Sequence, residues 1–340
     1  MKINNFKSDK NGKKTYIHVL ALGGTIACAL KNQIEEFYEH PSISISELIS
    51  SLPLDKERVT VTSEQFSQQI SHEMTHDDLI LVARRINELA NNDRVDGIVV
   101  THGTDCIEET AYFINLVIKT KKPIVFTGAF RPTNALGFDG IRNLYNAIVL
   151  ASNMLVAEIG VVLTFNDCIV NARDASKLNP SVMGDFSISG IGLMGFIQGD
   201  NLHIQRLSRY KHTYLSEFSI NEIKDLSKIY IIYGHLGVDG IFVDAAITNN
   251  AKGIISAGMG TGYQSKEMTE ALILASQKGI FVVRCSRTGQ GIVNRDPKMD
   301  DQYDFIAGGS LSPQKARILL SVALNKTEDR KEIQRIFDEY

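Results

Sequence analysis

Residues 77–128 contain the pattern that decides the fold, and they read DDLILVARRINELANNDRVDGIVVTHGTDCIEETAYFINLVIKTKKPIVFTG. Four apolar residues recur at helical spacing in the first part of this stretch: Leu79, Val82, Ile86 and Leu89. Thr75 stands just before them, where an N-cap belongs, so the pattern predicts a helix over 77–91. The apolar run 97–101 follows, and it is typical of a strand that is buried on both faces.

The same alternation extends through the first two-thirds of the chain. Short apolar runs bounded by Gly, Asn, Asp or Pro predict strands at 16–22, 97–101, 123–127 and 160–165. Helical patterns lie between them at 107–119 and 137–152. Alternating strands and helices favour an α/β fold, with a larger N-terminal domain whose parallel sheet has helices on both faces.

The C-terminal part repeats this alternation on a smaller scale. A hairpin is expected at 195–205, turning at 199–201, and the polar, weakly periodic stretch 209–227 is interpreted as a linker. The pattern then predicts strands at 229–233, 253–256 and 280–284, and helices near 266–278 and 312–324. We therefore expect an N-terminal α/β domain over 1–208 that carries the catalytic residues, and a smaller C-terminal α/β domain over 228–340.

Composition excludes several classes of protein. With 340 residues, of which 44% are hydrophobic, the chain can bury a sizeable core in two domains. The net charge is −3, and without a clustered basic face a nucleic-acid partner is not expected. No apolar run approaches the roughly 20 residues that a membrane span needs. Residues 1–14 are polar and basic without an apolar core, so we expect no signal peptide and a cytoplasmic location.

The four cysteines are far apart and form no C-x-x-C pair. They stand at Cys28, Cys106, Cys168 and Cys285, and are expected to be reduced and mostly buried. Cys28 and Cys106 lie close to the candidate catalytic residues. Nothing in the sequence marks either of them as an activated thiolate, so both are interpreted as small packing residues.

The ends of the predicted strands carry hydroxyl groups. In a parallel sheet the chemistry collects at the carboxyl ends of the strands. The first strand runs into Gly23-Gly24-Thr25, where two glycines permit a tight turn that would present the threonine hydroxyl. A later strand runs into 101–105, which places Thr104 and Asp105 at the start of a helix. Alternatively, Thr25 is a core residue and Asp105 only complements the helix dipole.

Lys177 follows the strand expected at 160–165, in the segment Arg173-Asp174-Ala175-Ser176-Lys177. A single lysine is usually a solvated surface charge. It acquires a chemical role only if it reaches Thr104, where a desolvated amine can act as a base.

Five segments together resemble the bacterial L-asparaginases in order and spacing. They are GGTIA at 23–27, THGTDCIEETAY at 101–112, GAFRPT at 128–133, NLYNA at 143–147 and SPQKAR at 312–317. The resemblance covers the chain from about residue 16 to residue 340. It implies a two-domain amidohydrolase that acts on a small amino-acid amide, forms homotetramers built from intimate dimers, and needs no metal or organic cofactor.

The resemblance also assigns roles to individual residues. It makes Thr25 the nucleophile, paired with Tyr38 from a mobile lid. A second catalytic cluster is implied at Thr104, Asp105 and Lys177. Substrate contacts are implied for Ser71, His72, Thr104 and Asp105. The implied reaction is attack of Thr25 on the amide carbon, release of ammonia, and hydrolysis of the acyl-enzyme by water polarised by Thr104 and Lys177.

Three positions depart from the family pattern, and all of them concern substrate recognition. His72 stands where the family commonly has an amide that binds the substrate carboxylate. Thr261 stands where many members carry an asparagine from the neighbouring subunit. Lys298 stands near the position at which some members supply a glutamate to the substrate amine. If His72 contacts the carboxylate, its protonated form binds more tightly and KM rises with pH. These departures keep open a related amidase that acts on glutamine or another small carboxamide.

Two other motifs point to different functions. His72-Glu73-Met74-Thr75-His76 matches the zincin pattern H-E-x-x-H, but the helical periodicity begins after Thr75, so the histidines are not expected to converge. The run 258–262 resembles a dinucleotide loop but lacks the last glycine. A metalloprotease, an amino-acid-binding protein without turnover and a glutamine-hydrolysing part of a larger complex remain the alternatives.

Overall fold

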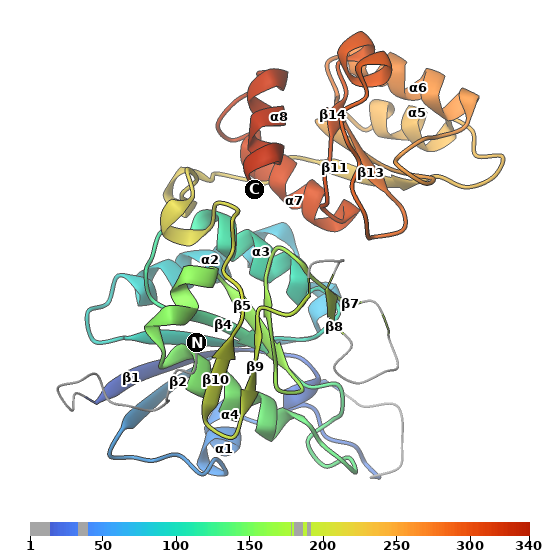
Figure 1. Cartoon of the computed structure of the whole chain (residues 1–340). Helices are drawn as coiled ribbons and strands as arrows, with labels where there is room; N and C mark the ends of the chain where they lie inside the picture. Colours follow the sequence, from blue (N-terminus) through green and yellow to red (C-terminus); the bar gives the residue numbers. More distant parts are fainter. Residues whose placement is uncertain (1–13, 33–39, 178, 180–185, 189–191) are drawn as a thin grey trace. The chain divides into compact units, whose positions relative to one another are not determined.

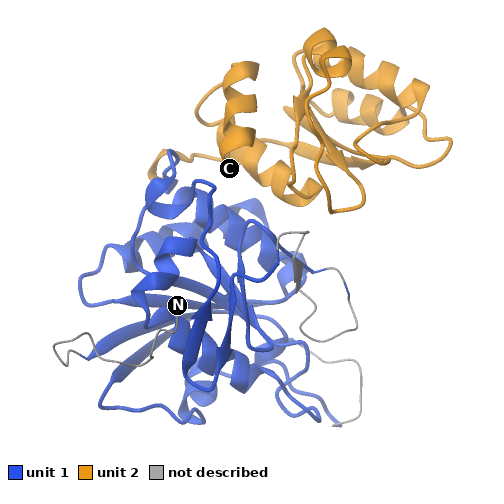
Figure 2. Cartoon of the chain, viewed as in Figure 1, with its two compact units in different colours: residues 1–220 blue, residues 221–340 orange. Residues whose placement is uncertain are grey.

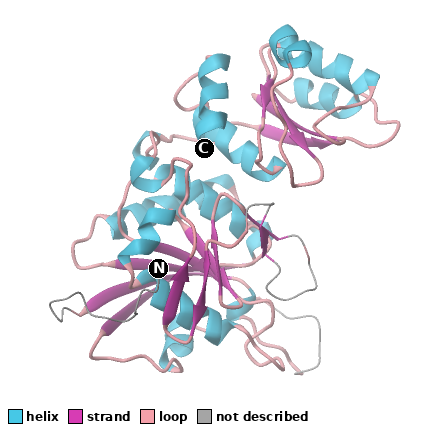
Figure 3. Cartoon of the chain, in the orientation of Figure 1, coloured by secondary structure: helices cyan, strands magenta, loops and turns pink. Residues whose placement is uncertain are grey.

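The computed structural model describes residues 14–32, 40–177, 179, 186–188 and 192–340. The chain divides into two compact units, 1–220 and 221–340 (Figure 2). Helices and strands occur in both units, which confirms the α/β prediction (Figure 3). Within the described residues no helix has the length and apolar character needed to cross a bilayer.

Unit 1 is built on an eight-stranded sheet in the order β10-β9-β6-β5-β4-β3-β1-β2. The parallel part contains β1 (Thr15–Gly23), β2 (Val59–Gln69), β3 (Gly97–Thr101), β4 (Ile124–Thr127) and β5 (Val162–Phe165). The antiparallel part contains β6 (Cys168–Asn171), β9 (Gly195–Gln198) and β10 (Asn201–Ile204). The sheet is therefore mixed, whereas the sequence pattern indicated a parallel one.

Helices cover both faces of this sheet, as predicted. Figure 1 shows α2 (His76–Ala90) and α3 (Ile107–Val117) on one side, and α1 (Ile45–Ser50) and α4 (Gly140–Ala151) on the other. The N-cap of α2 is Thr75, which exchanges hydrogen bonds with Asp78 in a capping box. Strands β3 and β4 are buried along their whole length because helices lie on both sides of them.

Some elements of unit 1 gave no clear sequence signal. Strand β2 reads VTVTSEQFSQQ, and most of its residues are only partly buried. It lies at the edge of the sheet, where a polar composition is tolerated. Strands β7 (Ala175–Lys177) and β8 (Phe186–Ile188) form a separate antiparallel pair, in which Lys177 is opposite Phe186.

Unit 2 is a four-stranded parallel sheet in the order β11-β12-β13-β14. The strands are β11 (Ile229–Tyr233), β12 (Gly253–Gly258), β13 (Phe281–Ser286) and β14 (Ile306–Ala307). On one face an apolar core joins the sheet to α5 (Ile241–Thr248) and α6 (Lys266–Gln277). Helices α7 (Pro313–Ala323) and α8 (Arg330–Glu339) lie on the other face (Figure 1).

The stretch interpreted as a linker is more ordered than its polar composition indicates. It contains two 3-10 turns, η4 (Thr213–Leu215) and η5 (Ile220–Glu222). Phe218 and His212 are buried within it. The boundary between the two units falls inside this stretch, after Ile220.

Candidate active site

Three chain segments converge at the carboxyl edge of the parallel strands of unit 1. Strand β1 lies between β2 and β3, so the turns after these strands are neighbours. A Cβ atom placed on Gly24 would lie 2.3 Å from Cα of Gly103, and one on Gly103 would lie 2.5 Å from Oγ of Ser71. Gly24 also has a φ of 79°. Only glycine fits these positions, because Gly24 lies directly against the backbone of Gly103, and Gly103 lies directly against the side chain of Ser71.

Thr25 opens the 3-10 turn η1 (Thr25–Ala27) directly after Gly24, and it is buried. The loop that follows β4 supports this turn, because Thr133 donates a hydrogen bond from Oγ1 to the carbonyl of Ile26 at 3.0 Å. The backbone contact between Gly24 and Gly103 places the turn of Thr25 beside the turn that carries Thr104. The predicted nucleophile and the predicted second cluster therefore share one edge of the sheet.

Thr104, Asp105 and Lys177 form a compact polar cluster. The Nζ atom of Lys177 lies 2.9 Å from Oγ1 of Thr104 and 2.7 Å from Oδ1 of Asp105. The lysine side chain is largely buried, and Thr104 is buried as well. The sequence brought these residues together only through the resemblance, and the structure places them in direct contact.

The charge state of Asp105 follows from its neighbours. Burial acts to raise the pKa of this carboxyl, but the hydrogen bond and positive charge of Lys177, with a smaller contribution from His72, outweigh it and lower the pKa. Asp105 is therefore ionised at neutral pH. A fixed negative charge at this place can hold the lysine and an incoming ammonium group.

Ser71 and His72 approach Asp105 from the end of β2. Ser71, in the 3-10 turn η2 (Ser71–Glu73), is buried and accepts a hydrogen bond from the backbone N–H of Asp105 at 3.3 Å. His72 lies with Nδ1 3.3 Å from Oδ2 of Asp105, and its side chain is 61% exposed. Both predicted substrate-binding residues thus lie at the cluster, whereas the predicted Tyr38 lies outside the described residues.

Two buried residues of this site had been given no role from the sequence. The ring of His102 is fully buried, with Nδ1 2.7 Å from the carbonyl of Gly103 and Nε2 3.0 Å from Oγ1 of Thr110. Because a carbonyl can only accept, Nδ1 carries the proton. Burial lowers the pKa of His102 to about 4, so the ring is neutral and fixes the turn between β3 and α3.

Glu108 is the second such residue. It is only 7% exposed, and its Oε2 accepts a hydrogen bond from the backbone N–H of Lys177 at 2.6 Å. The sequence places two adjacent carboxylates, Glu108 and Glu109, after Ile107 and does not distinguish between them. Helical spacing alone does not reveal that this carboxylate is buried.

The cysteines near the site are unreactive by environment. All four cysteines are free, and Cys28 and Cys285 are buried while Cys106 and Cys168 are half-buried. Burial raises the pKa of Cys28 to about 11 and, with the charge of Glu109, that of Cys106 to about 12. Neither thiol is a thiolate at neutral pH, which confirms their interpretation as packing residues.

The zincin pattern does not form its metal geometry here. His72 belongs to η2, and α2 begins only at His76, after the N-cap Thr75. The two histidines are therefore not on one face of one helix, as that pattern requires. Across the described parts of the chain, no three His, Cys, Asp or Glu side chains gather as metal ligands.

The dinucleotide-like run after β12 also has another explanation. Met259 and Tyr263 pair across a tight turn, and the chain passes Ser265, the N-cap of α6, before the helix begins. The glycines serve this turn: a Cβ atom on Gly258 would lie 2.4 Å from the carbonyl carbon of Gly262.

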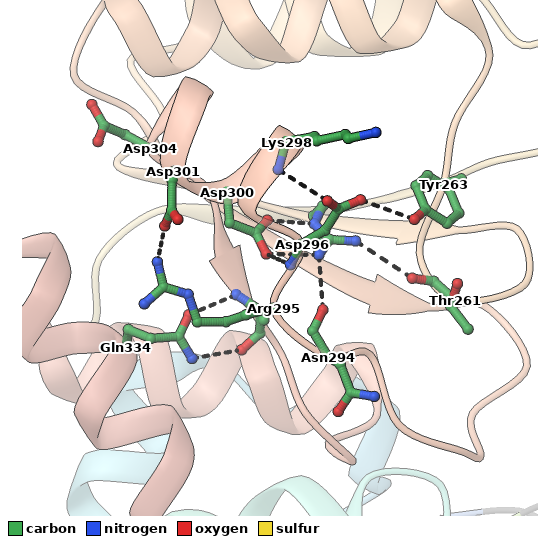
Figure 4. A network of polar contacts seen from close by, with 12 residues as sticks. Thr261, Tyr263, Asn294, Arg295, Asp296, Lys298, Asp300, Asp301, Asp304 and Gln334 are labelled. Carbon is green, nitrogen blue, oxygen red and sulfur yellow. Dashed lines mark hydrogen bonds and ion pairs between the residues drawn. The ribbon is translucent and has the colours of Figure 1, made fainter.

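Thr261 and Lys298 lie in unit 2, where they line one cavity of about 470 Å³. The buried guanidinium of Arg284 binds Asp300 at 2.6 and 2.8 Å and reaches the carbonyl of Thr261 at 3.4 Å. In Figure 4 the side chain of Lys298 extends away from this network, while its backbone N–H donates to Asp296 at 3.0 Å. The structure therefore places Thr261 and Lys298, which both depart from the family pattern, at the same cavity.

The two α/β units and the strand-end cluster define a class: a hydrolase that presents threonine hydroxyls and a lysine at the carboxyl edge of a parallel sheet. The family described as "Asparaginase, N-terminal" matches residues 16–209, and "Glutaminase/Asparaginase C-terminal domain" matches residues 228–337. The chain belongs to the asparaginase/glutaminase family and is an L-asparaginase-type amidohydrolase.

Proteins named L-asparaginase and proteins named glutaminase-asparaginase are both similar to this chain over nearly its whole length. L-asparaginase 2 of Escherichia coli is 36% identical over 325 residues, which cover 95% of this chain and 93% of that protein. L-asparaginase 2 of Bacillus subtilis is 40% identical, covering 95% and 86%. Glutaminase-asparaginase of Pseudomonas fluorescens is also 40% identical, covering 96% and 91%.

Proposed function

We propose that this protein hydrolyses L-asparagine to L-aspartate and ammonia through an acyl-enzyme on Thr25. One observation carries the proposal: the ammonium group of Lys177 contacts both Thr104 and Asp105, on a turn whose backbone touches the turn of Thr25. This arrangement supplies a hydroxyl for attack, a route for a proton and a fixed charge within one site.

The reaction proceeds in two chemical steps. In the first, the hydroxyl of Thr25 attacks the side-chain amide carbon, and the amide nitrogen leaves with the hydroxyl proton as ammonia. In the second, water attacks the ester while its proton passes through the hydroxyl of Thr104 to Lys177 in its neutral, accepting form. That proton then returns to the departing oxygen of Thr25, which releases L-aspartate and restores the enzyme. The Nζ atom of Lys177 lies 2.9 Å from Oγ1 of Thr104, within reach for this transfer. Backbone N–H groups at the strand ends stabilise the oxyanion in both steps.

Asp105 serves recognition as well as chemistry. One of its oxygens, Oδ1, binds Lys177, and the other, Oδ2, faces His72 at the exposed side. An α-ammonium group is the natural partner of an ionised carboxylate, and Oδ2 is the oxygen it can reach. Ser71, which is packed beneath the same turn, offers a hydroxyl to the α-carboxylate.

Glutamine is the second candidate substrate. Relatives named glutaminase-asparaginase, from Pseudomonas fluorescens and Acinetobacter glutaminasificans, are 40% and 38% identical to this chain. His72, Thr261 and Lys298 alter positions that bear on recognition of the amino-acid part of the substrate. One site can accept both amides if it does not discriminate between the side-chain lengths of asparagine and glutamine.

Ammonia release tests the proposed function. The panel contains L-asparagine, L-glutamine, both D-forms and N-acetylated L-asparagine, each with and without a chelator. We expect fastest release from L-asparagine, weak release from the capped amide because it lacks the ammonium group for Asp105, and no effect of the chelator. Release that needs metal indicates a metalloenzyme, and tight binding without release indicates a binding protein.

The pH dependence of KM tests the role of His72. Asp105 stays ionised because its pKa is lowered, whereas His72 carries a charge only when it is protonated. A protonated His72 pairs with Oδ2 and competes with the substrate ammonium, so KM should fall as pH rises. The change should be about two- to fivefold, since exposed ion pairs contribute roughly 1 kcal/mol or less.

The matched variant is His72→Gln, in which KM should depend little on pH. Contact of His72 with the substrate carboxylate, the interaction first expected from the sequence, gives the opposite sign, with KM rising as pH climbs. Parallel curves for the two proteins mean that His72 does not influence binding. Steady-state kinetics from pH 5.5 to 8.5 separate these three results.

We also propose that the protein is a homo-oligomer, with a C₂ dimer as the smallest active unit and a tetramer as the full assembly. Strand β11 is an edge strand, and beside it lies an apolar cavity of about 520 Å³ lined by Tyr230, Tyr233 and Phe242 among others. Leu236 and Ile241, which adjoin the lining residues His235 and Phe242 in sequence, are also exposed. Such a patch is unusual for a monomer and fits a second copy of the chain.

Light scattering at assay concentration tests this assembly. We expect a mass of four chains, with activity lost on dilution to monomers because Thr261 and Lys298 would then no longer face a neighbour's pocket. The substitution Phe242→Glu should weaken assembly by placing a charge in the apolar patch. A monomer with full activity contradicts the proposal.

The cytoplasmic location stays a prediction, to be tested by cell fractionation.

A further inference from the structure

Hydrogen bonds hold Lys177 both at its backbone and at its ammonium group. Its ammonium group contacts Thr104 and Asp105, and its backbone N–H donates to Glu108 at 2.6 Å. All three acceptors belong to the segment that leaves β3 and opens α3, since Glu108 lies in the first turn of that helix. One short stretch of chain therefore fixes both the backbone and the tip of the lysine.

Fixing the backbone matters because lysine is long and flexible. Two hydrogen bonds at the ammonium group still allow the four-carbon stem and the strand beneath it to shift. The strand β7, which ends at Lys177, is paired with β8 in a separate two-stranded sheet outside the main sheet. The bond from Glu108 ties this small sheet to α3, and thus to Thr104 and Asp105.

The environment of Glu108 favours this function. A buried carboxylate is costly unless it is hydrogen-bonded, and the N-terminus of a helix stabilises negative charge. Glu108 meets both conditions, because it is buried in the first turn of α3 and accepts a short bond. Its Oε2 accepts from the backbone N–H of Lys177 and not from the ammonium group, so Glu108 sets position without being a partner in proton transfer.

We propose that Glu108 is a positioning residue for the amidohydrolase reaction: its carboxylate fixes the backbone of Lys177 so that the ammonium group meets Thr104. This inference rests on the proposed role of Lys177 in acyl-enzyme hydrolysis. The simpler explanation is that Glu108 only complements the dipole of α3. The two explanations place different requirements on the side chain. Positioning needs a hydrogen-bond acceptor that reaches the backbone of Lys177, whereas the helix dipole needs a negative charge.

Two conservative variants separate these explanations. Glu108→Gln keeps the reach and an acceptor oxygen but removes the charge, whereas Glu108→Asp keeps the charge but falls one methylene short. We expect kcat for ammonia release to stay within about threefold of wild type for Gln and to fall about 10- to 100-fold for Asp, the range for a lost bond to a charged group. KM should change little. The neighbouring Glu109→Gln, which removes a charge from the same turn, is the matched control and should behave like wild type.

A double-mutant cycle and a pH profile complete the test. In a Lys177→Met background Glu108→Asp should cause no further loss of kcat, because the positioned group is already absent. The pH profile of kcat should shift in Glu108→Asp and not in Glu109→Gln. Since both Glu108 variants keep a polar side chain, thermal melts should show folded proteins.

The opposite order, with Asp close to wild type and Gln impaired, overturns the proposal in favour of the dipole. Additive losses in the Lys177→Met background also overturn it. The proposed function is judged separately in the same assay: if wild type releases no ammonia, or Thr25→Val keeps its turnover, that function fails whatever the Glu108 variants do. If those two controls behave as expected and the Glu108 order is reversed, only the positioning role fails.

Discussion

Replacing Thr25 by valine is expected to lower ammonia release from L-asparagine by about four to six orders of magnitude, the loss typical of removing a covalent nucleophile. Valine keeps the shape of threonine but has no hydroxyl, so no acyl-enzyme forms. Thr25 is buried on a turn whose backbone is fixed by Gly24 and by the bond from Thr133. The fold should therefore survive, at a cost of about 1 kcal/mol for the lost hydroxyl interactions.

Thr127→Val is the matched control for this variant. Thr127 is also a buried threonine at the end of a parallel strand, and its Oγ1 donates to the carbonyl of Thr164 at 2.8 Å. Its loss should lower the melting temperature and leave kcat within a few-fold of wild type. Turnover and thermal melts of both variants give the comparison. Wild-type turnover in Thr25→Val would exclude Thr25 as the nucleophile.

The second large effect is expected from Thr104→Val. This change removes the hydroxyl that lies 2.9 Å from Nζ of Lys177, and with it the route by which water loses its proton. Steady-state turnover should fall about a hundredfold to ten-thousandfold, the usual contribution of general acid–base catalysis. Attack by Thr25 does not need this route, so the first ammonia molecule should still be released rapidly.

Rapid-quench measurement of ammonia distinguishes the steps. Thr104→Val should show a burst of about one ammonia per active site followed by slow turnover, which is the behaviour of a blocked second step in covalent catalysis. Lys177→Met should behave similarly, since it removes the other partner of the same bond. A uniform loss without a burst would mean that Thr104 acts in the first step, against the proposed order of events.

The regular part of the fold was predictable because its signals are local. Strand β3 was predicted with its observed bounds, and α2 with its N-cap Thr75, from apolar spacing and one capping residue. Strand β2 was missed because an edge strand can be polar. The antiparallel strand β6 was missed because it follows β5 after the two-residue turn Asn166-Asp167, and not after a helix as the alternating pattern indicated.

The site was predictable in part. Two glycines and a threonine at a strand end indicated Thr25, since the backbone contact between Gly24 and Gly103 leaves room for nothing larger. Lys177 had no local signal, because its role depends on a contact 73 positions away in sequence. Glu108 was not found, because its burial depends on where β7 crosses α3. Such contacts arise from tertiary packing, which residue spacing does not encode.

The roles of the residues that depart from the family pattern depend on their contacts in the folded protein. His72 was expected at the substrate carboxylate, and the structure places its ring beside Oδ2 of Asp105; the two contacts predict opposite effects of pH on KM. Thr261 and Lys298, 37 positions apart by their residue numbers, line one cavity because Arg284 and Asp300 hold their two loops.

Direct detection of the covalent intermediate tests the central claim, that Thr25 forms an acyl-enzyme which Thr104 and Lys177 then hydrolyse. Thr104→Val is mixed with L-asparagine, quenched in acid during the burst, and analysed by intact mass and peptide mapping. We predict a mass increase of one aspartyl group per chain, located on Thr25, in proportion to the ammonia released. Ammonia released in the burst without any adduct, or an adduct on another residue, would contradict the account.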